Sequence, residues 1–142
     1  MTIQPAPIYQ ELADDQGKPT LPWTLFFNNV RDGDSGAAWA PTFQNLGSTG
    51  TPTISGRYYK LSKYLTYFTV TVTPATDTTS TAGTTYIDNF PLNFTGDGVV
   101  FAVTGNLGDG PGHIVSSNNR IYVPAWTSVT APVVCVGIAE AT

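Results

Sequence analysis

The sequence contains few of the residues on which catalytic and metal sites most often depend. Its 142 residues include one cysteine, Cys135, and one histidine, His113. A single cysteine cannot form an internal disulfide, and a single histidine excludes a metal site with two histidine ligands. Cys135 lies among valines in "PVVCVGIAE", which indicates a small buried core residue. His113 follows "GDGPG", which indicates a surface position in a loop or at a strand end.

Charge is also scarce. Only 11% of the residues are charged, and 6 Lys+Arg against 10 Asp+Glu give a net charge of −4. A non-specific nucleic-acid binder needs basic side chains along a groove, so we expect no nucleic-acid partner. No apolar run approaches the ~20 residues of a membrane helix. The first residues, "MTIQPAPIYQELADDQGKPT", lack the basic and apolar regions of a signal peptide. We therefore expect no membrane partner and assembly in a cytoplasm.

Recognisable catalytic motifs are missing as well. The sequence has no G-x-S-x-G elbow, P-loop or G-x-G-x-x-G. The stretch "DGDSG" (32–36) matches half a calcium loop, but Gly36 occupies the third ligand position and no terminal glutamate follows, which favours a turn. The carboxylates are scattered, mostly in turns, so a glycosidase pair is a minor alternative. We predict no cofactor, no metal and no enzymatic activity.

The residues that are abundant favour β-structure. Threonine is the dominant polar residue, and Gly and Pro contribute 14 and 11 residues. Thr, Val, Tyr and Phe suit pleated, half-buried strands, whereas helix formers such as Glu, Lys and Met are scarce. We predict an all-β protein of one domain, an antiparallel β-sandwich of the jelly-roll type over residues 46–142.

A period of two is clearest in "SGRYYKLSKYLTYFTVTVTP" (55–74), which holds half of the basic residues. The second half predicts a half-buried strand, with Phe68, Val70 and Val72 on one face and Thr69, Thr71 and Thr73 on the other. "GRYYKL" predicts a shorter strand, and Ser62 and Lys63 fit a tight turn between the two. The stretch is therefore interpreted as a hairpin whose tyrosines pack, rather than as a basic–aromatic binding platform.

Further strands follow at short spacing. We predict them in "YIDNFPLNF" (86–94), "GVVFAVTGN" (98–106) and "APVVCVGIAEA" (131–141), with a hairpin in "HIVSSNNRIYVPA" (113–125). The Thr/Ser-rich stretch 73–85 is predicted to be a loop.

Residues 1–45 form a different segment, a proline-rich N-terminal arm. Its prolines remove backbone donors and favour extended geometry, so a compact core of its own is not expected. Yet Trp23, Phe26 and Phe27 make it too apolar for a disordered tail. We expect these three aromatic residues to bury against the body or a neighbouring chain, and the arm to serve in attachment or between subunits.

One stretch resembles a module of tailed-bacteriophage virion proteins: "AAWAPTFQNLGSTGTPTISGRYYKLSKYLTYFTVTVTP". The matching positions are Trp39, Pro41, Phe43, Gly56, Tyr58, Lys60, Phe68, Val70 and Val72. "SSNNRIYVPAW" is similar to the terminal hairpin of such proteins, and the N-terminal segment resembles their leaders. Ser62 departs from the glycine usual in the family turn, which puts the turn type in doubt. In that family the module is a β-sandwich, typically trimeric, on fibres, tail tips or capsid decorations.

The resemblance implies a virion structural protein that binds itself, as a homotrimer, and other virion proteins. Such a protein would assemble in the cytoplasm of a bacterial host and reside in the particle. The main alternative is a module that binds carbohydrate on the host surface, with Trp39 and Trp126 as exposed aromatic contacts that stack on sugar rings. Exposure of both tryptophans in a shallow groove would favour this alternative.

Overall fold

The computed structural model of the chain describes residues 15, 16, 18, 20, 36–104 and 107–142. The aromatic residues of the predicted arm, Trp23, Phe26 and Phe27, lie outside these described residues. Among the described residues the first strand begins at Ala37, so residues 37–45, which were predicted as part of the arm, contribute strands to the body.

The described part of the chain is all-β, as predicted, with a single turn of 3₁₀-helix at Ser116–Asn118. Antiparallel strands form a nine-stranded sheet in the order β1-β4-β5-β12-β8-β9-β10-β7-β2 and a three-stranded sheet in the order β11-β6-β3. The strands are β1 (Ala37–Trp39), β2 (Phe43–Gln44), β3 (Gly47–Thr49), β4 (Thr53–Lys60), β5 (Leu65–Thr73), β6 (Asp77–Ser80), β7 (Tyr86–Ile87), β8 (Gly98–Thr104), β9 (Leu107–Val115), β10 (Arg120–Tyr122), β11 (Trp126–Val129) and β12 (Val133–Glu140). Within the described residues, no helix has the length and apolarity needed to span a bilayer.

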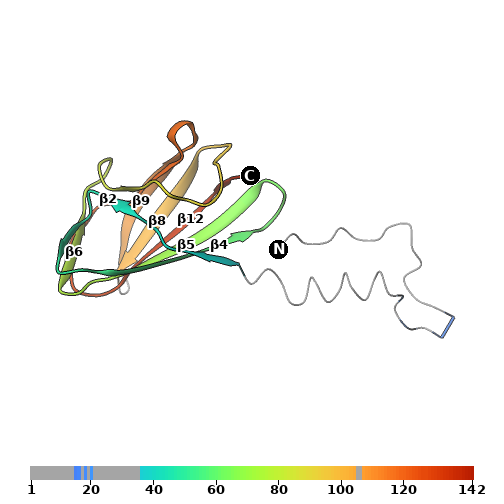
Figure 1. Cartoon of the computed structure of the whole chain (residues 1–142), viewed down its shortest axis with the longest axis horizontal. Helices are drawn as coiled ribbons and strands as arrows, with labels where there is room; N and C mark the ends of the chain where they lie inside the picture. Colours follow the sequence, from blue (N-terminus) through green and yellow to red (C-terminus); the bar gives the residue numbers. More distant parts are fainter. Residues whose placement is uncertain (1–14, 17, 19, 21–35, 105–106) are drawn as a thin grey trace.

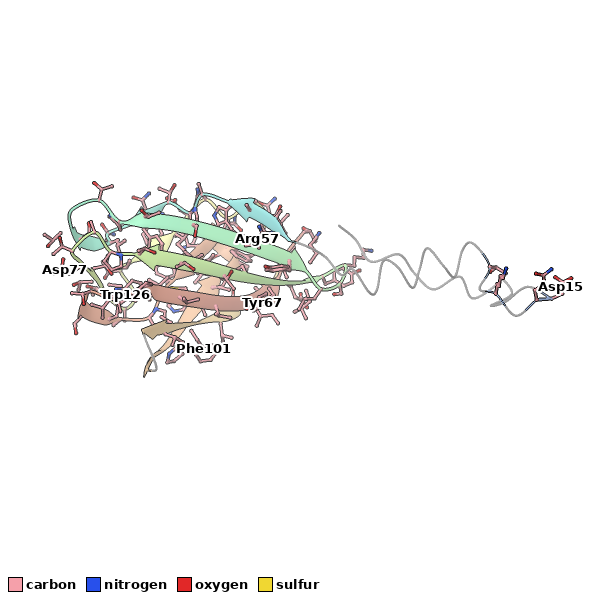
Figure 2. All side chains as sticks on the ribbon, turned by 90° about the horizontal axis from the view of Figure 1, so that it is seen from below. Asp15, Arg57, Tyr67, Asp77, Phe101 and Trp126 are labelled. Atoms are coloured by element: carbon pink, nitrogen blue, oxygen red, sulfur yellow. The ribbon has the colours of Figure 1, made fainter. Side chains whose placement is uncertain are left out.

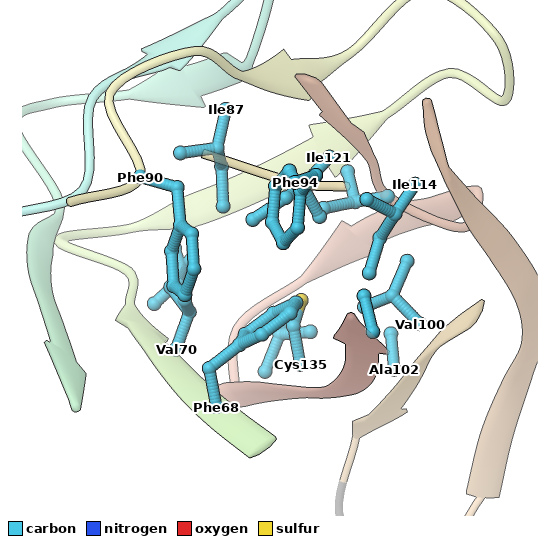
Figure 3. Packing of buried hydrophobic residues seen from close by; sticks show 14 of the residues in the cluster. Phe68, Val70, Ile87, Phe90, Phe94, Val100, Ala102, Ile114, Ile121 and Cys135 are labelled. Carbon is cyan, nitrogen blue, oxygen red and sulfur yellow. The ribbon is translucent and has the colours of Figure 1, made fainter. Parts of the chain in front are cut away.

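The large sheet curls around a single core (Figure 1). Phe68 and Cys135 enter this core from the central strands, while Ile87 and Ile121 enter it from β7 and β10 near the far end of the same sheet. Figure 3 shows these side chains facing one another around Phe90 and Phe94. Cys135 is fully buried, as its apolar sequence context predicts.

The predicted alternation in residues 68–73 is confirmed. Phe68, Val70 and Val72 are each 0% exposed, whereas the intervening threonines lie half-buried on the outer face. Strand β5 pairs with β4 on one side and with β12 on the other, so its inner side chains lie in the middle of the sheet. The predicted strands at 98–106 and 131–141 and the hairpin over 113–125 are also present.

Two of the predicted segment assignments are wrong. Residues 73–85 are not all loop, because β6 lies within them and joins the three-stranded sheet. Only Tyr86–Ile87 is a strand in 86–94, and Phe94 adds an isolated bridge to Ala141. His113 is exposed as expected and lies in β9, together with the preceding "GDGPG".

The β4–β5 turn also differs from the predicted two-residue turn. Residues 61–64 connect the strands, and the backbone N–H groups of Tyr64 and Leu65 donate to the Ser62 hydroxyl at 3.3 and 3.1 Å. A hydroxyl that accepts two backbone donors stabilises the turn without a glycine. This explains how Ser62 can occupy a position where the resembling family has glycine.

We expect the two faces of β5 to respond very differently to a new charge. Val70→Asp buries an unpaired carboxylate and should lower the free energy of unfolding by roughly 3–5 kcal/mol. Thr71→Asp, on the half-exposed outer face, should cost about 1 kcal/mol or less. Urea unfolding followed by circular dichroism measures both values. Equal and large losses would contradict the observed register.

Candidate interaction surface

The outer face of the large sheet changes character from one strand to the next. On β4 and β5 the outward residues include Arg57, Thr69 and Thr71, which are polar. On β12 and β8 the outward residues include Val136, Ile138, Val99, Phe101 and Val103. The polar outer face therefore becomes apolar towards the middle of the sheet.

We define the outer apolar patch as Tyr67, Val99, Phe101, Val103, Val136 and Ile138. The strand register makes these residues neighbours, because Ile138 pairs with both Tyr67 and Val99, and Val136 pairs with Phe101. Phe101 is 51% exposed, Val99 44%, and Val103 and Ile138 37% each. Figure 2 shows Arg57, Tyr67 and Phe101 on strands of this face. Large apolar side chains exposed together indicate an interaction site.

Most of the patch residues line a shallow groove of about 230 Å³ together with Gly137. A Cβ atom at Gly137 would overlap the ring of Phe68 on the inner face. The glycine lets this ring pack directly against the backbone of β12, beneath the groove. The groove thus lies on the outer face of the sheet, opposite the buried Phe68 ring, and its lining residues all belong to strands.

The sequence contained a signal for this patch that the alternation rule missed. β8 reads "GVVFAVT" and β12 reads "VVCVGIAE", which are nearly continuous apolar runs rather than alternating ones. Continuous apolar strands are typical of sheets that are covered on both faces. From Phe68 to Thr73 in β5 the apolar residues alternate with threonine, and the outer face of that part of the strand is correspondingly polar.

The structure corrects the expectation that Trp126 is an exposed aromatic contact. Trp126 is 2% exposed and belongs to the core cluster. Its indole Nε1 donates to Thr78 Oγ1 at 3.2 Å, and its backbone N–H donates to the Ser80 hydroxyl at 3.0 Å. The residue joins the three-stranded sheet to the core and offers no ring face to a sugar.

Trp39 is half-buried rather than free at the surface. Its ring meets Phe90 edge-on at 5.1 Å and Phe68 at 6.2 Å between centroids. Its Nε1 atom is buried and has no hydrogen-bond partner among the residues described. The two predicted tryptophans therefore do not form a shallow sugar-binding groove.

A different aromatic group lies at the far end of the large sheet. His113 stacks on Tyr122 at 4.9 Å between ring centroids, and Tyr122 lies 5.4 Å from Tyr86. The Arg120 guanidinium lies over the Tyr86 ring at 4.3 Å. A hydrogen bond between Arg120 and Tyr122 lowers the pKa of the Tyr122 phenol and raises that of the guanidinium. We call these four residues the aromatic stripe; the sequence analysis did not identify it.

Asp97 is an acidic residue whose side-chain contacts stabilise the fold. The backbone N–H and the hydroxyl of Ser116 both donate to Asp97 Oδ1 at 2.8 Å, and these two bonds lower the pKa of Asp97. Asp97 thereby holds the β9–β10 connection in place. Among the residues that the structure describes, no three His, Cys, Asp or Glu side chains are grouped as metal ligands.

Adjacent valines on β8 test whether the outer patch is dispensable for folding. Val99→Ser should lower the free energy of unfolding by about 1 kcal/mol or less, because the side chain is 44% exposed. Val100→Ser, at a position that is 0% exposed, should cost roughly 2–4 kcal/mol through lost packing and an unsatisfied hydroxyl. Urea titration of the two variants gives the comparison. A cost at Val99 as large as that at Val100 would show that the patch is part of the fold's own core.

Comparison with known proteins returned no family model, no curated protein and no solved structure that matches the chain.

Proposed function

We propose that the protein is a non-enzymatic structural component of a tailed-phage particle, in a fibre, a tail tip or a capsid decoration, and that it assembles as a homotrimer. The virion assignment is supported by the resemblance over residues 37–74 and by the low-charge, threonine-rich β-domain. Self-association is supported by a separate observation, the outer apolar patch on β12 and β8.

The patch favours association through the face of the sheet. Strands β8 and β12 have the composition of strands covered on both sides, yet their outer face is exposed in the single chain. The edges of the large sheet offer a partner much less backbone for pairing, because β1 has three residues and β2 has two. Short edge strands are a common means of preventing edge-to-edge pairing. A partner would therefore cover the face and leave the edges unused.

We further propose that the two sheets form the layers of a β-sandwich with a jelly-roll-like arrangement. The supporting contact is Trp126, which extends from β11 of the three-stranded sheet into the core that the large sheet surrounds. Val123 and Trp126 bury against the same cluster as Phe68. In the proposed sandwich, the small sheet covers one side of the core that the large sheet encloses.

Light scattering at micromolar concentration tests self-association. We expect a mass close to three times 15.1 kDa for the full chain. Phe101→Asp puts a charge in the middle of the patch and should shift the protein to monomer, because desolvating an unpaired carboxylate opposes burial. Thr71→Asp, on the polar part of the same face, is the matched control and should leave the mass unchanged. A monomeric full chain would contradict the proposal.

Electron microscopy of intact particles, with an antibody against the protein, tests the virion assignment. Label on the capsid, the tail tip or the fibres would support it and identify the location, whereas unlabelled particles would contradict it.

A second candidate function is recognition of a host-surface glycan, favoured by the aromatic stripe. Aromatic rings beside an arginine are suited to stacking on sugars and to hydrogen bonding with their hydroxyls. If this function holds, a glycan array should show binding that Tyr122→Ala abolishes and Phe101→Asp preserves. No bound glycan, or binding that is insensitive to Tyr122→Ala, would eliminate the stripe as a receptor site.

A further inference from the structure

We propose that the outer apolar patch is the docking site for the arm segment Trp23–Phe27 of a neighbouring copy of the chain. This inference rests on the proposed homo-oligomer and names the contact that would hold it together. It combines the patch, the sequence of the segment, and the length of chain between the segment and the body.

The size of the patch fits a short segment better than a second globular face. The exposed parts of Val99, Phe101, Val103 and Ile138 amount to roughly 300 Å². A stable interface between two folded surfaces buries about 800 Å² on each partner. Two or three aromatic or aliphatic side chains, each burying about 150–250 Å² if aromatic, match the smaller area.

The segment Trp23–Phe27 has the matching chemistry. Its sequence "WTLFF" contains no charge, and the patch contains none either. In an extended chain Trp23, Leu25 and Phe27 would point to one side at steps of about 7 Å. The outward residues of β8, namely Val99, Phe101 and Val103, repeat at the same step. An extended segment laid along the groove therefore meets an apolar residue at each step.

The described body begins at Gly36, in the row of the sheet that contains Tyr59. β1 runs antiparallel to β4 with Ala37 opposite Tyr58, and a Cβ built on Gly36 would lie 2.6 Å from Cε1 of the Tyr59 ring. Strands β4, β5 and β12 separate β1 from β8, so the patch of the same chain lies about 20 Å across the sheet from Gly36. That patch is also within reach of the arm, and the choice of a neighbouring copy rests on the proposed homo-oligomer.

The reach of the arm is sufficient for exchange between copies. Phe27 precedes Gly36 by nine residues (36 − 27 = 9), which can span up to about 30 Å. The connecting residues 28–35, "NNVRDGDS", are mostly polar and need no apolar cover. A segment of this length can pass from the edge of one subunit to the patch of a subunit packed beside it.

Disulfide trapping in the full-length chain tests this docking. Leu25→Cys and Phe101→Cys are prepared as separate variants, one of them isotopically labelled, then mixed in denaturant, refolded together and oxidised. We expect a covalent dimer that contains one chain of each kind, identified by its mass. Cys135 is buried, so the wild-type chain should give no such band. Leu25→Cys mixed with Thr71→Cys is the matched control and should also give none.

Each other outcome would overturn the inference in a distinct way. A dominant disulfide between two Phe101→Cys chains would show that the patch pairs with itself. If a chain that carries both substitutions forms only an intramolecular disulfide at low protein concentration, the segment docks on its own body. If Leu25→Cys cross-links to neither Phe101→Cys nor Val103→Cys while light scattering still gives a trimer, the arm does not occupy the patch although the proposed oligomer stands. A monomer throughout would reject both.

Discussion

The packing of Phe68 against Gly137 is the contact on which the rest of the structure depends. Because Gly137 has no side chain, the Phe68 ring can approach the backbone of β12. Strands β5 and β12 and the inner residues of β8 thereby form one continuous inner surface of the sheet. Trp39 and Phe90 pack on the other side of this ring, and the aromatic group continues through Phe90 to Phe94. A larger side chain at position 137 would displace Phe68 and strand β12, and with them the core residues that the curled sheet encloses.

The sequence alone predicts those strands in which one face is polar and the other is apolar. In the second half of β5, Thr69, Thr71 and Thr73 mark the outer face. The buried residues Phe68, Val70 and Val72 then follow from a period of two. The class of fold and the burial of Cys135 could be predicted for the same local reason. The strand β6 could not, because "DTTS" has no apolar residue and becomes a strand only through its partners β3 and β11.

The interaction surface was harder to predict than the core. The expectation that Trp126 is a surface contact fails because its indole donates to Thr78 inside the protein. Continuous apolar strands indicate burial without indicating which face stays exposed, so they do not by themselves predict the patch. Which side remains exposed depends on how far the sheet curls, and this is a property of long-range pairing rather than of any single segment. Tyr122 and Tyr86 likewise meet only through the pairing of β10 with β7.

The position of β12 has a consequence for the order of events during synthesis. Residues 133–140 lie in the middle of the large sheet, between strands that are made about 30 to 70 residues earlier. On the ribosome, β5 and β8 therefore have no common neighbour until this late strand has emerged, and the core cannot close before then. The segment 23–27 leaves the ribosome well before the groove exists. Under the proposed docking, nascent chains on one messenger would present this segment to each other's newly completed bodies. The last step of folding would then be coupled to the first step of assembly.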